Sequence, residues 1–402
     1  MQLKFLKTST FGYYGDMTVN AVKAFQKSIK IPVTGVADKN TINLLIKASA
    51  VPKASNGKTE NQQNTSQVFT FKKGTPGSLS GKIVVIDPGH GFNDPGVTRE
   101  NVYEKTMTLD MGLRLKRILT EAGAMVIMTR ATDGNSGYNS LYYRSAVANK
   151  LIVDLEREKL EKENAEFEKQ MSNFQNLLIS KGAELEKLNS EDREINKQKI
   201  DDLTKEIAEL TESSDELKEK IDLNKTRIED LYNMSLTFNY YIEQPSYKER
   251  YGIMKNPLEM AKVFELTKEK YNKDIVFVSI HCNSTTAETQ TSASGVQVYV
   301  QTENDTYYTD YYNNYDYERR KILGMSLLQE LNLSTGFSKK YTSLFKSRLS
   351  VLRENNLPSV LVEIGFFNNP SDLKIIKDQQ QRENASFGMY KGIEKYFEYW
   401  KK

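Results

Sequence analysis

The sequence predicts an α/β protein whose main domain has three layers, αβα, around a mixed sheet. Three observations predict this architecture. Short runs of β-branched residues such as Ile83–Ile86 alternate with longer stretches of helical periodicity, which is typical of a layered α/β domain. A densely charged segment from about 151 to 233 instead places apolar residues at 3-4 spacing, the pattern of a coiled coil. The first 49 residues carry helical patterns alone, so we expect a small all-α domain there.

These patterns divide the chain into four parts. We expect the helical domain over 1–49, a linker over 50–80, an α/β domain formed by 81–150 and 240–402, and an antiparallel coiled-coil hairpin inserted at 151–239. The linker is polar and rich in turn-forming residues, as flexible connections are.

Composition excludes some classes of function. A net charge of +3 over 402 residues, with no basic tail, argues against nucleic acid as a partner. The single cysteine, Cys282, excludes an internal disulfide, which fits the cytosol but also secreted proteins without disulfides. No apolar run is long enough to span a membrane. Met1–Leu6 is too short and polar for a signal peptide, so either the protein is not exported by that route or an N-terminal segment is missing.

The remaining elements follow from periodicity and turn signals. In the helical domain, Ala21, Phe25 and Ile29 recur at helical spacing, and Asp38 is placed to cap a second helix. In the α/β domain we expect strands at 83–86, 124–128, 275–280, 296–300 and 360–364. We expect helices at about 102–122, from 140, from 257, from 307 through 331, and over 387–397. Gly123 suits the end of the first of these helices.

The charged segment is long enough for two helices. Asn189–Asp192 suits a turn between them, with Ser190 capping the second helix. Each arm of about 40 residues would extend roughly 60 Å at 1.5 Å per residue. A single long helix is the alternative, but it would leave the two halves of the α/β domain far apart. After the hairpin, Phe238–Gly252 is aromatic and less regular.

The chain contains two histidines, and both follow apolar strands. His90 comes after the 83–86 strand, and His281 after the 275–280 strand. Ligand sites of open α/β sheets lie at such strand ends, and histidine is the commonest metal ligand. A shared metal is therefore our hypothesis. The alternative is two hydrogen-bonded core histidines.

Two glutamates are candidates to complete such a site. Glu104, in the first turn of the predicted helix, would complete the His2Glu set of catalytic zinc sites. Alternatively, Asn101 caps this helix and Glu104 is the reciprocal capping residue. Glu363 stands inside an apolar strand, where a carboxylate is costly to bury without a partner. It suits a general base beside a metal-activated water. The alternative is a salt-bridged carboxylate at the edge of the sheet.

Several motifs occur in an order that is specific when taken together: Val85–Gly91, Asp94–Gly96, Glu104–Lys105, Thr129–Arg130, Ser279–Asn283, Val351–Arg353, Pro358 and Val362–Phe366. In these motifs the chain resembles the zinc-dependent N-acetylmuramoyl-L-alanine amidases of the amidase type 3 family over about 82–150 and 255–400. The first part of the chain resembles the C-terminal part of the peptidoglycan-binding domain type 1 family, through Phe11–Gly12, Thr18, Ala21–Gln26, Pro32–Val36 and Thr41.

The first resemblance implies a secreted cell-wall hydrolase that acts outside the cell or in the wall. It implies Zn²⁺ held by His90, Glu104 and His281, with Glu363 as the catalytic carboxylate. The zinc-activated water would cleave the amide bond between N-acetylmuramic acid and the L-alanine of the peptidoglycan stem peptide. Phe92 departs from the family, which usually has a second glycine there. Cys282 has no third histidine to activate it, so we interpret it as a packed thiol.

The N-terminal resemblance implies binding to peptidoglycan, although the first helix of that family would begin before Leu3, so we expect this copy to be clipped. The alternative is a helical cap without a ligand.

Two further alternatives remain, one for the whole chain and one for the hairpin. The first is a catalytically inactive wall-binding or scaffold protein that uses the coiled coil to bind a partner. The second concerns the hairpin, which is either a spacer or self-association arm, or a regulatory arm that blocks the cleft or receives an activating protein. In the regulatory case we expect Phe238–Tyr251 to pack near the cleft.

Overall fold

A computed structural model describes residues 16–36, 41, 44, 69–133, 140–243, 257–286, 290–301 and 315–401. In the N-terminal part, the predicted first helix is present as α1 (Asp16–Ser28). The predicted second helix lies mostly outside the described residues. Across the described ranges, none of the helices combines the length and hydropathy needed to cross a membrane.

A six-stranded sheet forms the centre of the α/β domain. Its strand order is β4 (Met125–Met128), β1 (Ile83–Pro88), β5 (Ile275–Asn283), β8 (Ser359–Phe366), β6 (Val296–Val300) and β7 (Phe345–Lys346). The first four strands are mutually parallel, β6 is antiparallel to β8, and β7 is parallel to β6. The predicted mixed sheet is therefore confirmed.

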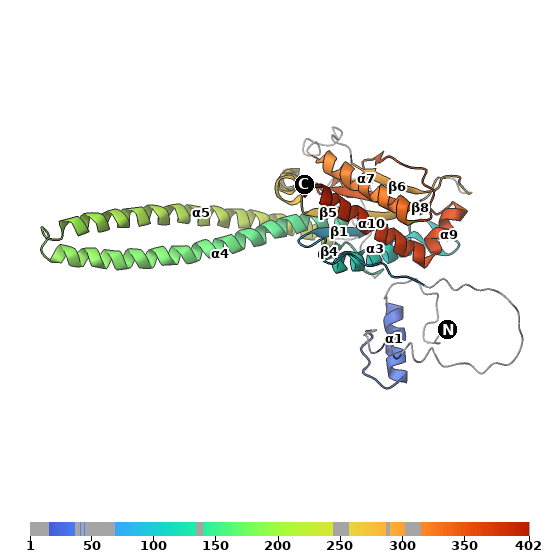
Figure 1. The fold of residues 1–402 in the computed structure, drawn as a ribbon, viewed down its shortest axis with the longest axis horizontal. Helices are drawn as coiled ribbons and strands as arrows, with labels where there is room; N and C mark the ends of the chain where they lie inside the picture. The colour runs from blue at the N-terminus through green and yellow to red at the C-terminus, as the bar shows by residue number, and fades with distance from the viewer. Residues whose placement is uncertain are drawn as a thin grey trace, which may run out of the picture.

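Helices cover both faces of this sheet, which confirms the predicted three layers (Figure 1). Side chains alternate along β1, so Val84 and Ile86 point to one face and Val85 to the other. The first face packs against α3 (Glu104–Glu121), α7 (Tyr317–Ser334), α9 (Pro370–Lys377) and α10 (Gln379–Tyr399). The second packs against α4 (Leu141–Ser190) and α8 (Ser350–Arg353), with α6 (Pro257–Leu266) and the π-helical turn η1 (Thr267–Tyr271) at its margin.

The helix predicted from about Val102 begins two residues later than expected. Thr98–Arg99 (β2) and Val102–Tyr103 (β3) pair as a small antiparallel ribbon, and α3 starts at Glu104. Strand β5 is longer than predicted and includes His281. The short elements β7, α8 and α9 were not predicted, because two to eight residues carry too little periodicity.

The inserted segment forms the predicted helical hairpin, which projects from the α/β domain (Figure 1). Its arms are α4 and α5 (Lys197–Glu243). The cap predicted at Ser190 is wrong, because its hydroxyl donates to the Lys187 carbonyl within α4. The turn instead uses Asp192, whose side chain accepts from the backbone amide of Glu194. The prediction of irregular structure from Phe238 is also wrong for the described part, since α5 continues to Glu243.

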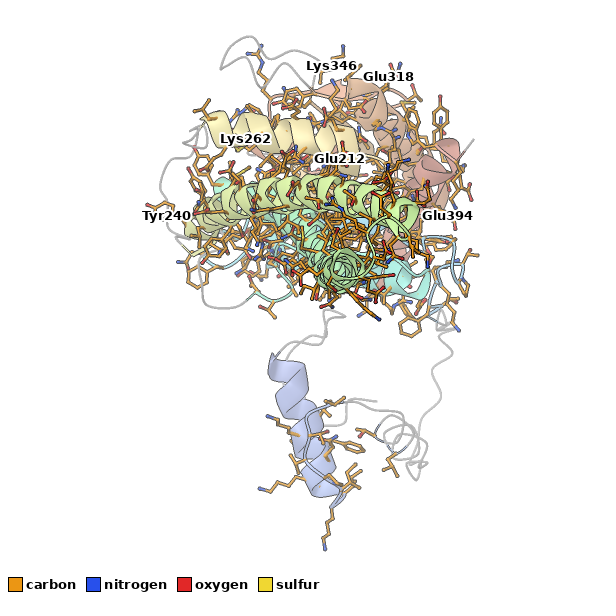
Figure 2. All side chains as sticks on the ribbon, turned by 90° about the vertical axis from the view of Figure 1, so that its left-hand side faces the viewer. Glu212, Tyr240, Lys262, Glu318, Lys346 and Glu394 are labelled. Carbon is orange, nitrogen blue, oxygen red and sulfur yellow. The ribbon has the colours of Figure 1, made fainter. Side chains whose placement is uncertain are left out.

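Contacts between the arms fix their antiparallel register. Near the domain, Ser235 Oγ donates to Asp154 Oδ1 over 2.9 Å. Further out, Lys225 pairs with Glu168 at 3.2 Å. Figure 2 looks at the molecule from the side of the hairpin and labels Lys262, whose ammonium lies 3.7 Å from an Asp230 carboxylate oxygen. Helix α6 therefore contacts α5 beside the domain.

Helix α4 crosses the whole sheet before it enters the free part of the hairpin. In its first turn, Arg144 bonds the carbonyl of His90, at the carboxyl end of β1. Three turns later, Glu156 accepts a hydrogen bond from Tyr271, just before the start of β5. The free part of the arms therefore extends beyond the amino edge of the parallel strands, away from His90.

Candidate metal centre and active site

His90 lies in a loop that the surrounding side chains hold in an uncommon conformation. Its backbone φ is +60°, in the left-handed region that non-glycine residues seldom adopt. Arg144 donates to the carbonyls of Pro88 (2.8 Å) and His90 (2.6 Å). Arg130 donates to the carbonyls of Pro88 and Gly89, both at 2.9 Å. Two buried guanidinium groups thus fix the backbone that carries the histidine.

Asp87 supports the same loop by binding the guanidinium of Arg144. Its carboxylate accepts hydrogen bonds from Thr129 (2.6 Å), Ser279 (2.7 Å) and Arg144 (2.5 Å). Burial by itself would raise the pKa of Asp87, but the Arg144 charge and these hydrogen bonds hold it below its usual value. The carboxylate therefore stays ionised as the counter-charge to Arg144.

His281 approaches His90 from the neighbouring strand β5. The two imidazole rings meet edge to face, with centroids 4.8 Å apart. The His281 ring lies against Gly89, where an added Cβ would come within 2.4 Å of it. A glycine at this position is therefore required for the two histidines to approach each other.

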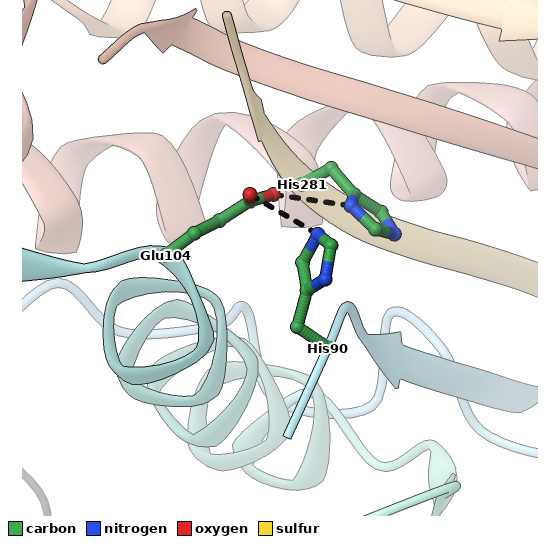
Figure 3. A group of neighbouring side chains, drawn as sticks. All are labelled: His90, Glu104 and His281. Carbon is green, nitrogen blue, oxygen red and sulfur yellow. Dashed lines mark hydrogen bonds and ion pairs between the residues drawn. The ribbon is translucent and has the colours of Figure 1, made fainter. Parts of the chain in front are cut away.

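Glu104 lies between the two histidines, as Figure 3 shows. Its Oε2 is 3.1 Å from His90 Nε2, and its Oε1 is 3.1 Å from His281 Nδ1. The backbone amides of Val97 and Cys282 also donate to this carboxylate, each at 3.0 Å. The capping alternative is wrong, because Tyr103 occupies the N-cap position without a side-chain cap bond and the Glu104 carboxylate points into the site.

The electrostatics of the cluster follow from these contacts. Burial alone would raise the pKa of Glu104, but the hydrogen bonds from His281 and His90 lower it well below its usual range. Burial would lower the pKa of His90, but hydrogen bonds to Asp94 and Glu104 outweigh that effect and raise it to about 9. The carboxylate is therefore ionised, and the imidazole of His90 is strongly basic.

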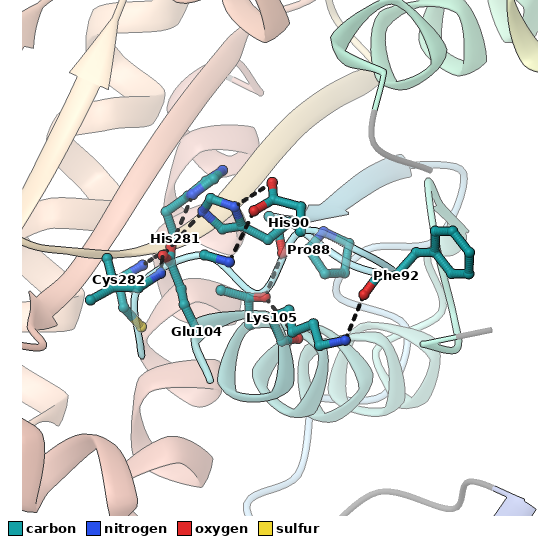
Figure 4. A network of polar contacts seen from close by, with 12 residues as sticks. Pro88, His90, Phe92, Glu104, Lys105, His281 and Cys282 are labelled. Atoms are coloured by element: carbon teal, nitrogen blue, oxygen red, sulfur yellow. Dashed lines mark hydrogen bonds and ion pairs between the residues drawn. The ribbon is translucent and has the colours of Figure 1, made fainter. Parts of the chain in front are cut away.

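The three side chains offer a donor set that fits zinc. One nitrogen from each histidine and one Glu104 oxygen lie within 4.8 Å of one another. Two imidazoles and one carboxylate form a known catalytic zinc set. His90 Nδ1 donates to Asp94 over 2.8 Å, which leaves Nε2 directed at the cluster. Carboxylates commonly orient metal-binding histidines in this way. Figure 4 shows how these contacts continue into the loop around Pro88.

Glu363 adjoins this cluster on the next strand. It is the direct cross-strand neighbour of His281 on β5, and Gln297 of β6 faces it on its other side. Its Oε2 is buried without a hydrogen-bond partner among the described residues. Burial and the nearby charge of Glu104 raise the pKa of Glu363 well above its usual value. The salt bridge of the alternative prediction is absent from the contacts of the described residues.

Cys282 is buried beside Glu104, and burial raises the pKa of its thiol well above the usual value. A thiol that stays protonated is a poor nucleophile, which agrees with its interpretation as a packed side chain.

The roles of Asp94 and Arg144 were not found by sequence reasoning, although both residues lie in stretches that had been recognised. A carboxylate four residues after a histidine was the available signal for Asp94. Arg144 is 54 residues from His90, and nothing in its local sequence indicates where its guanidinium lies.

A pocket of about 320 Å³ lies between the β2–β3 ribbon and the chain that follows β8. Phe367, Pro370 and Leu373 form an apolar wall, and Arg99 and Glu100 bring charges of opposite sign. Because the ribbon leads into Glu104 and β8 carries Glu363, the pocket borders the carboxyl edge of the sheet, where the histidines lie.

Comparison with protein families gives two matches. Residues 84–156 and 175–395 match the family described as N-acetylmuramoyl-L-alanine amidase. Residues 1–45 match a family described as a peptidoglycan binding domain.

Individual proteins resemble shorter parts of the chain. A germination-specific N-acetylmuramoyl-L-alanine amidase from Bacillus subtilis is 45% identical over 67 residues, which is 15% of this chain and 28% of that protein. An uncharacterized cell wall amidase of Bacillus anthracis is 30% identical over 176 residues, 44% of this chain and 30% of that protein. The chain thus spans less than a third of these curated relatives. A crystal structure of an N-acetylmuramoyl-L-alanine amidase from Clostridium difficile 630 covers 80% of this chain and 98% of its own, with 16% identity and a TM-score of 0.41.

Proposed function

The chain belongs to the N-acetylmuramoyl-L-alanine amidase family, and we propose that it hydrolyses the amide bond between N-acetylmuramic acid and the L-alanine of the peptidoglycan stem peptide. One observation carries this proposal. His90, Glu104 and His281 converge within 4.8 Å, and Glu363 lies on the adjacent strand. This arrangement suits metal-assisted hydrolysis of an amide, which needs a Lewis acid and a proton carrier side by side.

Zn²⁺ is the cofactor that the donor set supports best, with His90, Glu104 and His281 as its ligands. When bound there, zinc would acidify a water molecule and polarise the scissile carbonyl. Asp94 would keep the Nε2 of His90 turned towards the ion. The backbone amides of Val97 and Cys282 would keep Glu104 in place.

Glu363 is the proposed catalytic carboxylate. Its free oxygen can accept the proton of the attacking water, and the same group can then donate that proton to the nitrogen of the departing L-alanine. Burial and the nearby charge of Glu104 raise the pKa of Glu363, which supports this role because a raised pKa makes the carboxylate a better proton acceptor. Arg144, Arg130 and Asp87 do not take part in proton transfer. They hold the loop that carries His90.

The pocket beside Arg99 is the proposed binding place for the stem peptide. Its apolar wall can receive the alanine side and the following backbone. The guanidinium of Arg99 can bind a carboxylate of the peptide. This position would orient the amide bond with its muramoyl side away from the β2–β3 ribbon.

The remaining parts support action at the cell wall. We propose that 1–49 binds peptidoglycan, since residues 1–45 match a peptidoglycan binding domain. The chain would then work outside the cell, in the wall, with 50–80 as a linker. The catalytic domain would comprise 81–150 and 240–402, and the coiled-coil hairpin 151–239.

The test is to identify the bond that is cut. Purified peptidoglycan is incubated with the full chain, and new amino ends are labelled and identified by mass spectrometry. The proposal predicts new N-terminal L-alanine and intact glycan strands. New ends at any other residue of the peptide, or new reducing sugar ends, would contradict it. A chain with Glu363→Gln serves as the matched control for contaminating hydrolases.

A further inference from the structure

Helix α4 links two features that the proposed function leaves unconnected, the hairpin and the loop of His90. The helix is continuous for 50 residues, from Leu141 to Ser190. At 1.5 Å per residue this length is about 75 Å. Its first turn contacts the His90 loop, and its last turns form the far end of one hairpin arm (Figure 1).

At the first turn, the side chain of Arg144 makes this contact. It is 4% exposed and donates to the Asp87 carboxylate and to the carbonyls of Pro88 and His90. The planar guanidinium can reach several acceptors in fixed directions, which the point charge of a lysine cannot reproduce. The hydrogen bond to the His90 carbonyl acts on a backbone with φ +60°, so it restrains a residue that would relax if released.

The returning arm of the hairpin packs against the same turn of α4. The rings of Tyr142 and Tyr241 lie 5.7 Å apart, and Phe238 is buried in the same apolar cluster. At the amino ends of the parallel strands, Glu156 of α4 binds Lys270 and Tyr271, which precede β5 and His281. Helix α5 therefore packs against the turn of α4 that contacts the His90 loop, and α4 itself contacts the turn that precedes the strand of His281.

We propose that Arg144 is a positioning residue that couples the hairpin to the metal centre. In this account, a change in the hairpin that shifts or rotates the base of α4 is passed by Arg144 to the carbonyl of His90. This shift changes the position of His90 Nε2 relative to the donor atoms of Glu104 and His281. The free part of the arms extends away from His90, so a partner that binds there would act along α4. This inference rests on the proposed metal role of His90.

The experiment measures zinc affinity in a double-mutant cycle. One variant is Arg144→Lys. The other replaces 165–223 with a short Gly/Ser linker, which keeps Leu160 and Leu231 packed at the base of the hairpin. The third combines both changes. Arg157→Lys is the matched control, because Arg157 lies on the same helix and, among the ion pairs of the described residues, pairs with Asp154 and Glu161 of that helix and not with the His90 loop.

Arg144→Lys is expected to weaken zinc binding about 10–100-fold, as loss of groups that support metal ligands does. It should also alter the visible absorption of the cobalt-substituted protein, whereas Arg157→Lys should change neither. Shortening the hairpin should shift the zinc dissociation constant about threefold or more when Arg144 is present, and not when it is lysine. Equal shifts in both backgrounds, or no shift in either, would overturn the coupling.

A second measurement separates this inference from the proposed metal site. Amide hydrogen exchange of the 88–92 segment is compared in chelator-treated protein, so its outcome does not depend on zinc. Faster exchange is expected in Arg144→Lys and an altered rate in the hairpin-shortened chain. Unchanged exchange in the folded hairpin-shortened chain contradicts the coupling even if Arg144→Lys fails to fold. Absence of zinc binding by the unaltered chain would instead reject the metal site itself.

Discussion

His281 and Glu363 are direct neighbours across the parallel strands β5 and β8. The pairing places a candidate metal ligand and a carboxylate with a raised pKa on adjacent strands at the same edge of the sheet. The register of these two strands therefore determines the distance between the candidate metal centre and the proposed proton carrier. The role of each residue can be tested by substitution.

Replacing Glu363 by alanine should separate metal binding from catalysis. The variant should keep its zinc and its fold, because Glu363 is not part of the donor cluster. It should lose about 10²–10⁴-fold in peptidoglycan hydrolysis, the usual contribution of a general acid–base group. Turnover is measured by release of L-alanine amino ends, and zinc by elemental analysis. Near-normal turnover in a folded, zinc-loaded variant would reject the role.

Replacing Glu104 by glutamine tests the third ligand. The neutral amide cannot supply the charge that the two histidines share, so zinc content should fall strongly at equal protein concentration. Helix stability should change little, since the side chain makes no cap bond. Asn101→Ala is the matched control for the capping interpretation and should keep its zinc. Full zinc occupancy in Glu104→Gln would remove this residue from the ligand set.

The sequence predicted the two histidines more firmly than it predicted Glu104. Each histidine follows a strand whose apolar run is visible by itself, so its place at the sheet edge follows from local pattern. The sequence left the role of Glu104 open between metal ligand and helix cap. The β2–β3 ribbon determines where α3 begins, and each strand of that ribbon is only two residues long. The hairpin was predictable from periodicity. The helical state of Phe238 was not, because its packing against Tyr142 and α6 is a contact between distant parts of the chain.

The Asp87–Arg144 pair should make the metal-free protein acid-sensitive. The pKa of Asp87 is lowered in the folded state, so its contribution to the free energy of unfolding is present above the unfolded value of 3.8. That contribution is lost as the pH falls through the lower, folded pKa. At pH 7, Asp87→Asn should cost about 3–5 kcal/mol, because it leaves a buried guanidinium without its counter-charge.

Urea unfolding of both chelator-treated proteins between pH 7 and pH 2 measures this effect. The stability difference between the unaltered chain and Asp87→Asn should be constant near neutral pH and should narrow in acid. A difference that does not depend on pH would show that Asp87 does not act through its charge.

Arg99 should affect substrate binding and not the chemical step. Arg99→Ala should raise KM for stem-peptide substrates that carry a carboxylate, with kcat changed little, because the pocket binds ground state and transition state alike. Lys374→Ala, in α9 beyond the pocket lining, is the control with an equal change of charge. An equal rise in KM for substrates with and without the carboxylate would argue against this pocket as the carboxylate site.

In the proposed function, His90, Glu104 and His281 hold a zinc ion that is required to cleave the muramoyl–alanine bond. The most direct measurement is a zinc titration of chelator-treated protein, followed by release of L-alanine amino ends from purified peptidoglycan. We expect no release without metal, and a release that rises with added zinc and saturates at one zinc per chain. Full release from protein shown to contain no metal, or saturated zinc binding without any release, would contradict it.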